Sequence, residues 1–259
     1  MSEVIINKTK INFIQAQNFD NARPTLLFIH GAGQSSSTWR FQKDRFSGSS
    51  KFNFIAIDLP GHGKSEGEGF RTIAEYKSFL IEFIETLKLN RPILIGHSMG
   101  GGIAMLIAIQ NPEIVNALVL VATGAKLSVA QQTLIAAKDN YKEFCELASQ
   151  RMFAEDSLEE LKHEFRDGLL SIRPEVSYGD LIACNEFNIL NDLDKIAHPT
   201  LIISSDKDIL TPIKYGEYLH QNIYGSEFHQ IKGSGHFIMQ EKSIEFNLLL
   251  QNFLSDIIE

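Results

Sequence analysis

The stretch RPILIGHSMGGGIAMLIA, from Arg91 to Ala108, places one serine between two apolar segments. Its first part, PILIGH (92–97), is a near-continuous apolar run, as in strands covered on both faces of a parallel sheet. Its second part, MGGGIAMLIAIQ (99–110), is small and apolar, as in a buried helix. Ser98 stands between them, with Gly96 and Gly100 on either side. The stretch therefore predicts a strand, a tight turn with a serine at its tip, and a helix.

Outward from this stretch, short apolar runs alternate with longer amphipathic segments. Further strands are expected at KINFIQA (10–16), TLLFIH (25–30), FNFIAIDL (52–59), NALVLVAT (116–123), TLIISSD (200–206) and SEFHQIKG (226–233). Apolar residues at helical spacing predict helices over 72–88 and 241–257. Strand–helix–strand alternation implies an α/β fold with a mostly parallel, twisted sheet and helices on both faces.

The segment 124–197 differs from the rest because it contains no convincing strand. Three parts of it, 128–153, 157–171 and 174–187, have helical patterns. We therefore expect a core domain formed by 1–123 and 198–259, with 124–197 inserted as a helical cap, or lid. Because ligands of open α/β sheets bind at the carboxyl ends of the strands, the cap is placed to form part of a pocket.

The composition excludes several classes of function. The 259 residues are 44% hydrophobic and carry a net charge of −8 without a block of like charges, so no nucleic-acid partner is expected. No signal peptide or membrane-spanning stretch is found, which predicts a soluble cytoplasmic protein with no membrane partner. Cys145 and Cys184 are expected to be reduced structural thiols. Glu160-x-x-His163 has metal-site spacing but no second copy, so a solvated helix face is favoured and no metal or cofactor is expected.

Two serines match the pattern Gly-x-Ser-x-Gly, Ser98 in GHSMG and Ser65 in GKSEG. A nucleophile at a strand-to-helix turn needs a strand before it and a helix directly after it. Ser98 has both, whereas EGEGFR after Ser65 is polar and flexible. A helix N-cap is the simpler role for Ser98, but it explains neither the flanking glycines nor the partners found downstream.

A serine nucleophile needs a base, and the base needs an orienting acid. His236 is the best-placed histidine, because it follows the last expected strand in a Gly-Ser-Gly loop. The acid should come from another strand end, where TLIISSDKDILTP offers Asp206 and Asp208. Asp208 is favoured, with Asp206 as a turn residue. The sequence thus predicts the catalytic set Ser98, Asp208 and His236.

The loop after the strand at 25–30 reads His30-Gly31-Ala32-Gly33 and is expected to complete an oxyanion hole. One backbone N–H should come from Met99, the residue after the nucleophile, and the other from Ala32. Gly31 and Gly33 would let the backbone approach a substrate. Trp39, the only tryptophan, is a further candidate for substrate binding, with packing at a helix start as the alternative.

These motifs together resemble the α/β-hydrolase superfamily of serine hydrolases, in the lidded branch that holds small esterases, cofactor-free haloperoxidase-like enzymes and carbon–carbon bond hydrolases. The resemblance rests on HGAG (30–33), DLPGHGKS (58–65), GHSMGG (96–101), DKDILTP (206–212) and GSGHF (233–237), which occur in the family's order. It implies the fold, the triad and the lid. The serine nucleophile argues against dehalogenase and epoxide-hydrolase activity. Ser205 departs from the family, in which Gly is common three residues before the acid.

The expected reaction is hydrolysis of a carboxylic ester with a small or medium acyl group through an acyl-serine, with water as the second substrate. Cleavage of a carbon–carbon bond in a diketone-like acid is an alternative, for which Arg40, Lys126 or Arg173 should project into the pocket. Perhydrolysis on the same acyl-enzyme and a ligand-binding receptor are further alternatives. Four apolar residues of the cap could face the pocket, although cap packing is favoured: Phe144, Phe153, Phe187 and Leu190.

Overall fold

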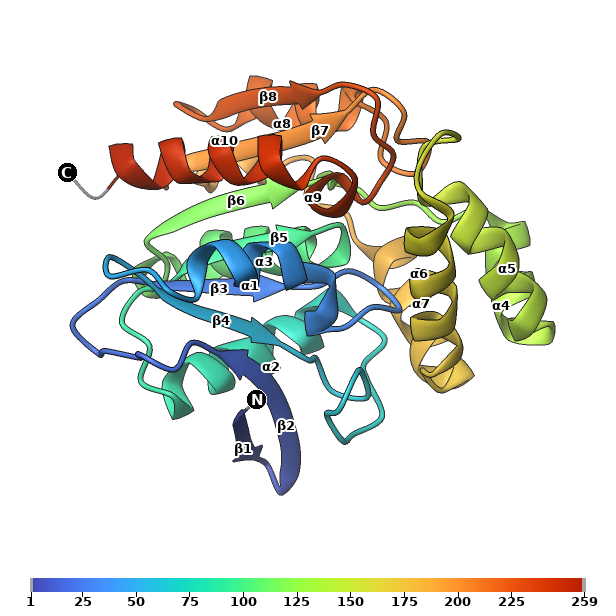
Figure 1. The fold of residues 1–259 in the computed structure, drawn as a ribbon, viewed down its shortest axis with the longest axis horizontal. Coiled ribbons are helices and arrows are strands. Elements are labelled where there is room, and N and C mark those ends of the chain that lie inside the picture. The colour runs from blue at the N-terminus through green and yellow to red at the C-terminus, as the bar shows by residue number, and fades with distance from the viewer. Residues whose placement is uncertain (1, 258–259) are drawn as a thin grey trace.

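The computed structural model describes residues 2–257, which contain one eight-stranded sheet of order β1-β2-β4-β3-β5-β6-β7-β8 (Figure 1). The strands are β1 (Ser2–Ile6), β2 (Thr9–Gln15), β3 (Thr25–Ile29), β4 (Asn53–Ile57), β5 (Ile93–His97), β6 (Ala117–Val121), β7 (Thr200–Ser205) and β8 (Glu227–Ile231). The six strands from β3 to β8 are parallel, and β1 and β2 form an antiparallel edge. The expected α/β fold with a mostly parallel sheet is confirmed.

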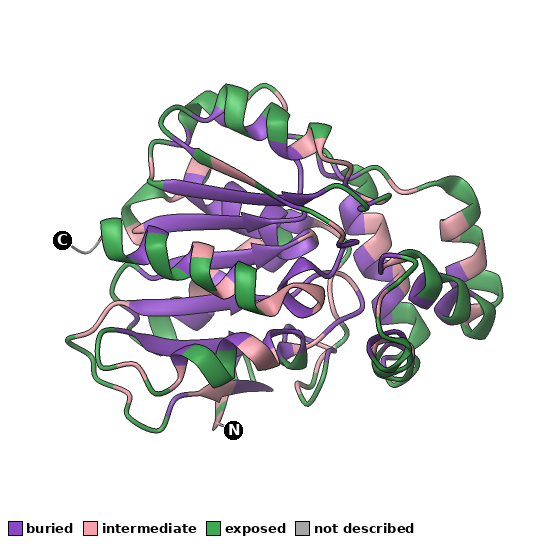
Figure 2. Cartoon of the chain, turned by 45° about the horizontal axis from the view of Figure 1, so that its top comes forward, coloured by how far each residue is buried: buried purple, intermediate pink, exposed green. Residues whose placement is uncertain are grey.

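Helices cover both faces of this sheet. One face carries α2 (Ile73–Thr86), α3 (Met99–Gln110) and α8 (Lys214–Asn222), and the other carries α1 (Arg40–Phe46), α9 (Ile238–Glu241) and α10 (Ser243–Asp256). Short 3-10 turns lie at Ser36–Trp39, Pro112–Ile114 and Leu193–Lys195. Figure 2 shows buried strands between helices whose outer faces are exposed. The strands β3 to β7 are buried along their whole length, which explains why they are apolar throughout rather than alternating.

The cap consists of α4 (Gln131–Asp139), α5 (Tyr141–Arg151), α6 (Glu159–Leu170) and α7 (Pro174–Glu186), inserted between β6 and β7. It lies at the end of the sheet to which the parallel strands point (Figure 1). The single helix predicted over 128–153 is wrong, because α4 ends where Asn140 adopts φ −145° and α5 begins at Tyr141. Asn140 leaves the helical region of the backbone, which allows the two short helices to run in different directions.

The first strand, β1, is missing from the sequence prediction. It is short and only partly buried, and it pairs with β2 across a turn in which Asn7 and Lys8 both have positive φ. Among residues 2–257, no helix is both long enough and apolar enough to cross a membrane.

Candidate active site

Ser98 sits at the tip of the turn between β5 and α3, with φ 52° and ψ −115°. Few residues other than glycine adopt positive φ. The flanking glycines make this turn possible: a Cβ on Gly96 would lie 2.3 Å from the carbonyl oxygen of Gly100, and one on Gly100 would lie 2.4 Å from that of Ile29. The Ser98 N–H donates to the carbonyl of Val121 on β6 at 2.9 Å. The turn therefore fixes the serine above the carboxyl ends of the central strands.

His236 and Asp208 are joined by a short contact. Nδ1 of His236 lies 2.7 Å from Oδ2 of Asp208, and both side chains are buried. Asp208 follows β7, and its other carboxylate oxygen accepts the N–H groups of Leu210 and Thr211. The Thr211 hydroxyl donates to Oδ2 at 2.7 Å. This network holds the carboxylate toward the imidazole, as an orienting acid requires.

The loop that carries His236 is fixed from several directions. The His236 N–H donates to the carbonyl of Met152 in the cap at 2.7 Å. The Ser205 hydroxyl donates to the carbonyl of Gly235 at 2.6 Å, so the departure from glycine at 205 adds a contact to this loop. Glu241 accepts the Gly235 N–H at 2.9 Å. Nε2 of His97 lies 3.0 Å from the carbonyl of His236, so His97, directly before Ser98, packs beneath the loop.

Two pKa shifts fit this arrangement. Burial alone would raise the pKa of Asp208, but the nearby His236 charge and hydrogen bonds from His236 and Thr211 lower it below the ordinary value. Burial, together with the adjacent His236, lowers the pKa of His97 well below its ordinary value. Asp208 is therefore ionised near neutral pH, where His97 is uncharged.

Two backbone N–H groups are available for an oxyanion. Within residues 2–257, Gly31 N–H donates to Gln34 and Gly33 N–H donates to Asp180, whereas the N–H groups of Ala32 and Met99 have no protein acceptor. Met99 opens α3 and is buried, and Ala32 lines the same cavity as Ser98. This pattern of two free donors beside the serine is what an oxyanion hole requires.

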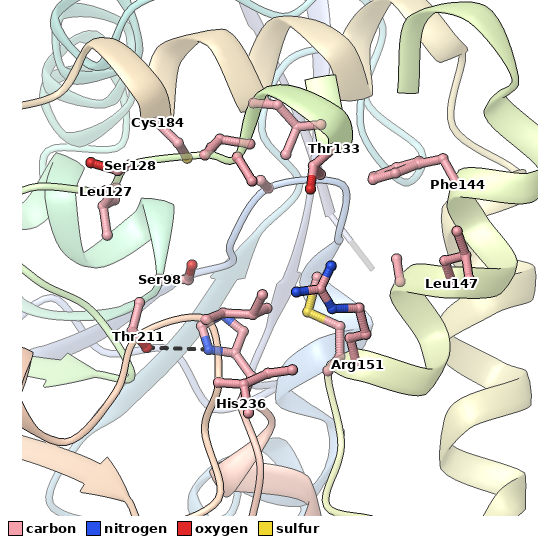
Figure 3. Close-up of a pocket in the computed structure, with 18 of the residues that line it drawn as sticks. Ser98, Leu127, Ser128, Thr133, Phe144, Leu147, Arg151, Cys184, Thr211 and His236 are labelled. Atoms are coloured by element: carbon pink, nitrogen blue, oxygen red, sulfur yellow. Dashed lines mark hydrogen bonds between the residues drawn. The ribbon is translucent and has the colours of Figure 1, made fainter. Parts of the chain in front are cut away.

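Ser98 and His236 line a cavity of about 330 Å³ between the core and the cap (Figure 3). Its walls are mostly apolar and come from helices α4, α5 and α7 and from the loops at 127–130 and 209–211. Phe144 and Leu147 of α5 line it, and Ser128 and Thr133 add hydroxyl groups. Within the described chain no hydrogen bond joins Ser98 to His236. Such bonds are often long in unliganded enzymes and tighten around a substrate.

Three of the remaining candidate residues are absent from the wall of this cavity. Trp39 is fully buried against Phe28 and is absent from the cavity wall, so its predicted role in substrate binding is corrected to core packing beside a 3-10 turn. Gly33 faces a second, more polar cavity of about 340 Å³ beneath α6. Gly31 packs on Ser98, since a Cβ there would lie 3.1 Å from the serine Cβ.

The rejected alternatives have structural roles. Ser65 donates to the carbonyl of Asp58 and accepts the N–H of Asn12, so it stabilises the loop after β4. Asp206 accepts the Gly233 N–H at 2.7 Å, as a turn residue would. Of the cap aromatics, Phe144 lines the cavity, whereas Phe153 stacks on Phe237 away from it.

The cationic side chains named from the sequence do not line the cavity. Arg40 pairs with Glu164, Arg173 pairs with Glu68, and Lys126 forms a backbone bridge with Asn188. Arg151, which was not among them, projects from the end of α5 into the hollow above His236 (Figure 3). It forms no ion pair with any residue in the described range. The only sequence feature that indicates this role is its position near the end of a predicted cap helix.

Both cysteines are free and buried, and Cys184 also lines the cavity wall. Burial raises the pKa of the Cys145 thiol to about 11 and raises that of Cys184 further, so neither is a thiolate near neutral pH. Residues 2–257 contain no group of three His, Cys, Asp or Glu side chains placed to bind a metal ion.

Known proteins resemble this chain over nearly its whole length. A family model described as alpha/beta hydrolase fold matches residues 24–243. The solved structure of a thermophilic esterase has a TM-score of 0.88 and 32% identity, covering 99% of this chain and 98% of that one. A 2-hydroxymuconate semialdehyde hydrolase of Pseudomonas putida is 27% identical, over 89% of this chain and 86% of its own length. The karrikin insensitive 2 receptor CA of Petunia hybrida is 24% identical, over 90% and 93%.

Proposed function

Because the chain belongs to the alpha/beta hydrolase fold family, we propose that it is a serine hydrolase that cleaves a carboxylic ester of a small or medium acyl group. One observation carries the proposal. Ser98, in a strained strand-to-helix turn, opens into the same cavity as His236, whose other ring nitrogen contacts the buried carboxylate of Asp208. The similarity to a thermophilic esterase supports the choice of ester.

In the proposed mechanism, His236 accepts the Ser98 proton as Oγ attacks the ester carbonyl. The N–H groups of Ala32 and Met99 hold the oxyanion, and His236 then gives the proton to the leaving alkoxide. Water, deprotonated by the same histidine, releases the acid and restores the serine. Asp208 keeps the imidazole in the working tautomer and stabilises its cation. Each oxyanion donor contributes about 3 kcal/mol to lowering the barrier.

A phosphonate probe tests the nucleophile directly. We expect the label on Ser98, with loss of labelling in Ser98→Ala and a fall in kcat on p-nitrophenyl acetate of about a million-fold. Ser65→Ala is the matched control, because Ser65 has the same sequence pattern but is held in a structural loop. If Ser98→Ala is still labelled, Ser98 is not the nucleophile and the proposal is wrong.

A specific observation also favours a second candidate, hydrolysis of a substrate that carries a carboxylate. Arg151 places an unpaired cation in the cavity above the site. Diketone-like acids, the substrates expected for a carbon–carbon bond hydrolase, would meet it, and a curated relative is named a 2-hydroxymuconate semialdehyde hydrolase. A charge-assisted hydrogen bond contributes about 1.5 kcal/mol at the low end, or roughly ten-fold in kcat/KM.

Two esters of similar length separate the candidates. We compare p-nitrophenyl butyrate with mono-p-nitrophenyl succinate, which ends in a carboxylate. If carboxylates are recognised, Arg151→Gln should lower the succinate-to-butyrate ratio of kcat/KM about ten-fold, and Arg173→Gln, an exposed arginine outside the cavity, should leave it unchanged. Equal ratios in wild type and Arg151→Gln would favour neutral esters.

Perhydrolysis and a receptor function are distinguished by rates. Hydrogen peroxide competing with water for the acyl-enzyme would produce peracid faster than acid at equal nucleophile concentration. A receptor would bind a ligand without turning over any ester of the panel. Under the ester proposal, acid is the main product and turnover depends on Ser98.

A further inference from the structure

A buried carboxylate in the cap contacts the core beside the oxyanion loop. Asp180, on α7, is fully buried, and every side-chain hydrogen bond it forms reaches a core element. Oδ2 accepts the Gly33 N–H at 2.8 Å and lies 2.7 Å from Nε2 of His62, and Oδ1 accepts the Tyr76 hydroxyl. The three partners come from the loop after β3, the loop after β4 and helix α2. One cap residue thus joins three parts of the core.

The geometry requires a charged partner for this carboxylate. Both ring nitrogens of fully buried His62 face acceptors, with Nδ1 3.0 Å from the carbonyl of Pro60 and Nε2 next to Asp180. A neutral imidazole has only one N–H, so only the imidazolium satisfies both contacts. His30, 4.9 Å away between ring centroids, differs, because its Nε2 accepts the Leu59 N–H and only its Nδ1 faces a carbonyl.

The direction of the pKa shifts agrees with this assignment. Burial alone would lower the pKa of His62, but the charge and hydrogen bond of Asp180 raise it above the ordinary value. Burial and the nearby His62 lower the pKa of His30 to about 3. The other titratable groups facing the pair are Asp58, Tyr76, Tyr141 and Cys184.

The carboxylate acts on the loop that carries an oxyanion donor. Gly31 N–H is bonded to Gln34 and Gly33 N–H to Asp180, so both neighbours of Ala32 are fixed. The Ala32 N–H between them remains free beside the cavity. Gly33 has φ +64°, and glycine adopts positive and negative φ about equally readily, so the hydrogen bond to Asp180 restricts its backbone orientation. Asp180 supplies that bond from the cap.

Close packing keeps α7 in place against the core. A Cβ on Gly179 would lie 2.9 Å from the carbonyl oxygen of Phe70, and Val176 contacts the space that a Cβ on Gly61 would fill. Leu181, the residue after Asp180, lines the same cavity as Ser98. The helix that shapes the substrate pocket is therefore the helix that holds the oxyanion loop.

We propose that Asp180, paired with the His62 imidazolium, is a positioning residue that orients the Ala32 N–H, so that the oxyanion hole is complete only while α7 is docked. This inference rests on the proposed serine-hydrolase function. It adds a cap residue to the catalytic machinery without contact between that residue and the substrate. Removing the charge should weaken stabilisation of the oxyanion and leave ground-state binding in the apolar cavity largely intact.

The test uses Asp180→Asn, which keeps the shape of the side chain but loses its charge. We expect kcat on p-nitrophenyl acetate to fall ten- to a hundred-fold with KM changed less than three-fold. Phosphonate labelling of Ser98 should slow in parallel, because the adduct also places an oxygen in the oxyanion hole. Tyr76→Phe is the matched control, since it removes one bond to the same carboxylate but leaves the Gly33 and His62 contacts.

A pH profile gives an independent measurement. A raised His62 pKa means that the pair's contribution to stability is fully present below pH 6.5, the ordinary histidine value, and is lost as pH rises through the folded-state pKa. Wild-type kcat and Tm should therefore decline together as pH rises above 6.5 and through the pKa of folded His62. His62→Gln should start with a lower kcat and lack this decline.

Several results would overturn the inference. A folded Asp180→Asn with wild-type kcat would do so, as would an equal loss of kcat in Tyr76→Phe at equal Tm. If Asp180→Asn does not fold, His62→Gln provides the test. A His62→Gln variant with wild-type kcat and the wild-type pH dependence of kcat and Tm would contradict the proposed Asp180–His62 pair. Failure of the proposed function is separate, because it would appear as activity retained in Ser98→Ala.

Discussion

At the scale of single residues, the turn at Ser98 shows how neighbouring glycines permit a strained backbone conformation. Ser98 adopts φ 52°, and the turn brings the backbone of α3 against β5 and β3. Neither a cap role for the serine nor helix propensity explains Gly96 and Gly100, but the absence of space for a Cβ does. The glycines are therefore required by contact with neighbouring carbonyl groups rather than by flexibility.

We expect Gly96→Ala to destabilise the protein. Its Cβ would lie 2.3 Å from the Gly100 carbonyl oxygen, which forces the turn apart and costs about 1–3 kcal/mol or more. Thermal unfolding should show a Tm lower by several degrees, with loss of esterase activity. Gly48→Ala is the control, because nothing lies within 4 Å of its Cβ. Equal Tm values for the two variants would contradict the packing argument.

Asp208→Asn separates the charge of the acid from its shape. We expect kcat to fall about 10⁴-fold, because the amide no longer holds the imidazole in the working tautomer. The pKa of Asp208 lies below its ordinary value of 3.8, so its contribution to stability is present above that pH and is lost as pH falls through the folded-state value. Unfolding of wild type and variant at pH 7 and pH 3 measures this, and the wild type should lose the greater stability in acid.

At the scale of elements, the sequence predicts what depends on local pattern. Buried strands such as β5 and helices such as α3 were found at nearly their observed bounds, because apolar runs and glycine placement are local signals. The hairpin strand β1 was missed because it is partly exposed, and the break at Asn140 because the helical pattern continues through it. The predicted substrate-binding role of Trp39 was wrong, because the sequence does not show whether this residue faces the cavity or the core.

The contacts of Asp180 and Arg151 could not be predicted from the sequence. Asp180 lies 118 positions from His62 and 147 from Gly33, and nothing in its local sequence marks it as buried. Arg151 faces the cavity only because α5 lies beyond the end of the sheet to which the parallel strands point. The proximity of Ser98, Asp208 and His236 was easier to predict, because strand ends in a parallel sheet meet at one edge.

The cap and the histidine loop meet at Glu241, and this junction can be tested. Glu241 accepts the N–H groups of Gly235 and Ala154 and the Ser157 hydroxyl. Glu241→Gln loses the charge and puts an N–H₂ where a donor points, which should cost about 1–3 kcal/mol and lower kcat. Glu85→Gln, at an exposed helix position, should change neither. Differential unfolding and p-nitrophenyl acetate assays would show the difference, and an unchanged Tm for Glu241→Gln would remove this role.

At the scale of the whole molecule, the core carries the proposed reacting groups and the cap supplies much of the cavity wall. Ser98, Asp208 and His236 all follow strands of the core, whereas Phe144 and Leu147 come from the inserted helices (Figure 3). Changes in the cap should therefore alter which ester is preferred, and changes at the strand ends should alter whether any ester is cleaved.

The size of the cavity leads to the last prediction. About 330 Å³ is at the low end for small-molecule pockets. Each buried methylene contributes about 0.8 kcal/mol, or roughly four-fold in kcat/KM, until the acyl chain meets the cap. We expect kcat/KM for p-nitrophenyl esters to rise from acetate to butyrate and hexanoate and to fall for laurate. Phe144→Ala, which enlarges the cavity on its cap side, should move the maximum of kcat/KM to a longer acyl chain and leave phosphonate labelling of Ser98 intact. A preference that rises steadily to laurate in the wild type would mean that the cap opens and does not limit chain length.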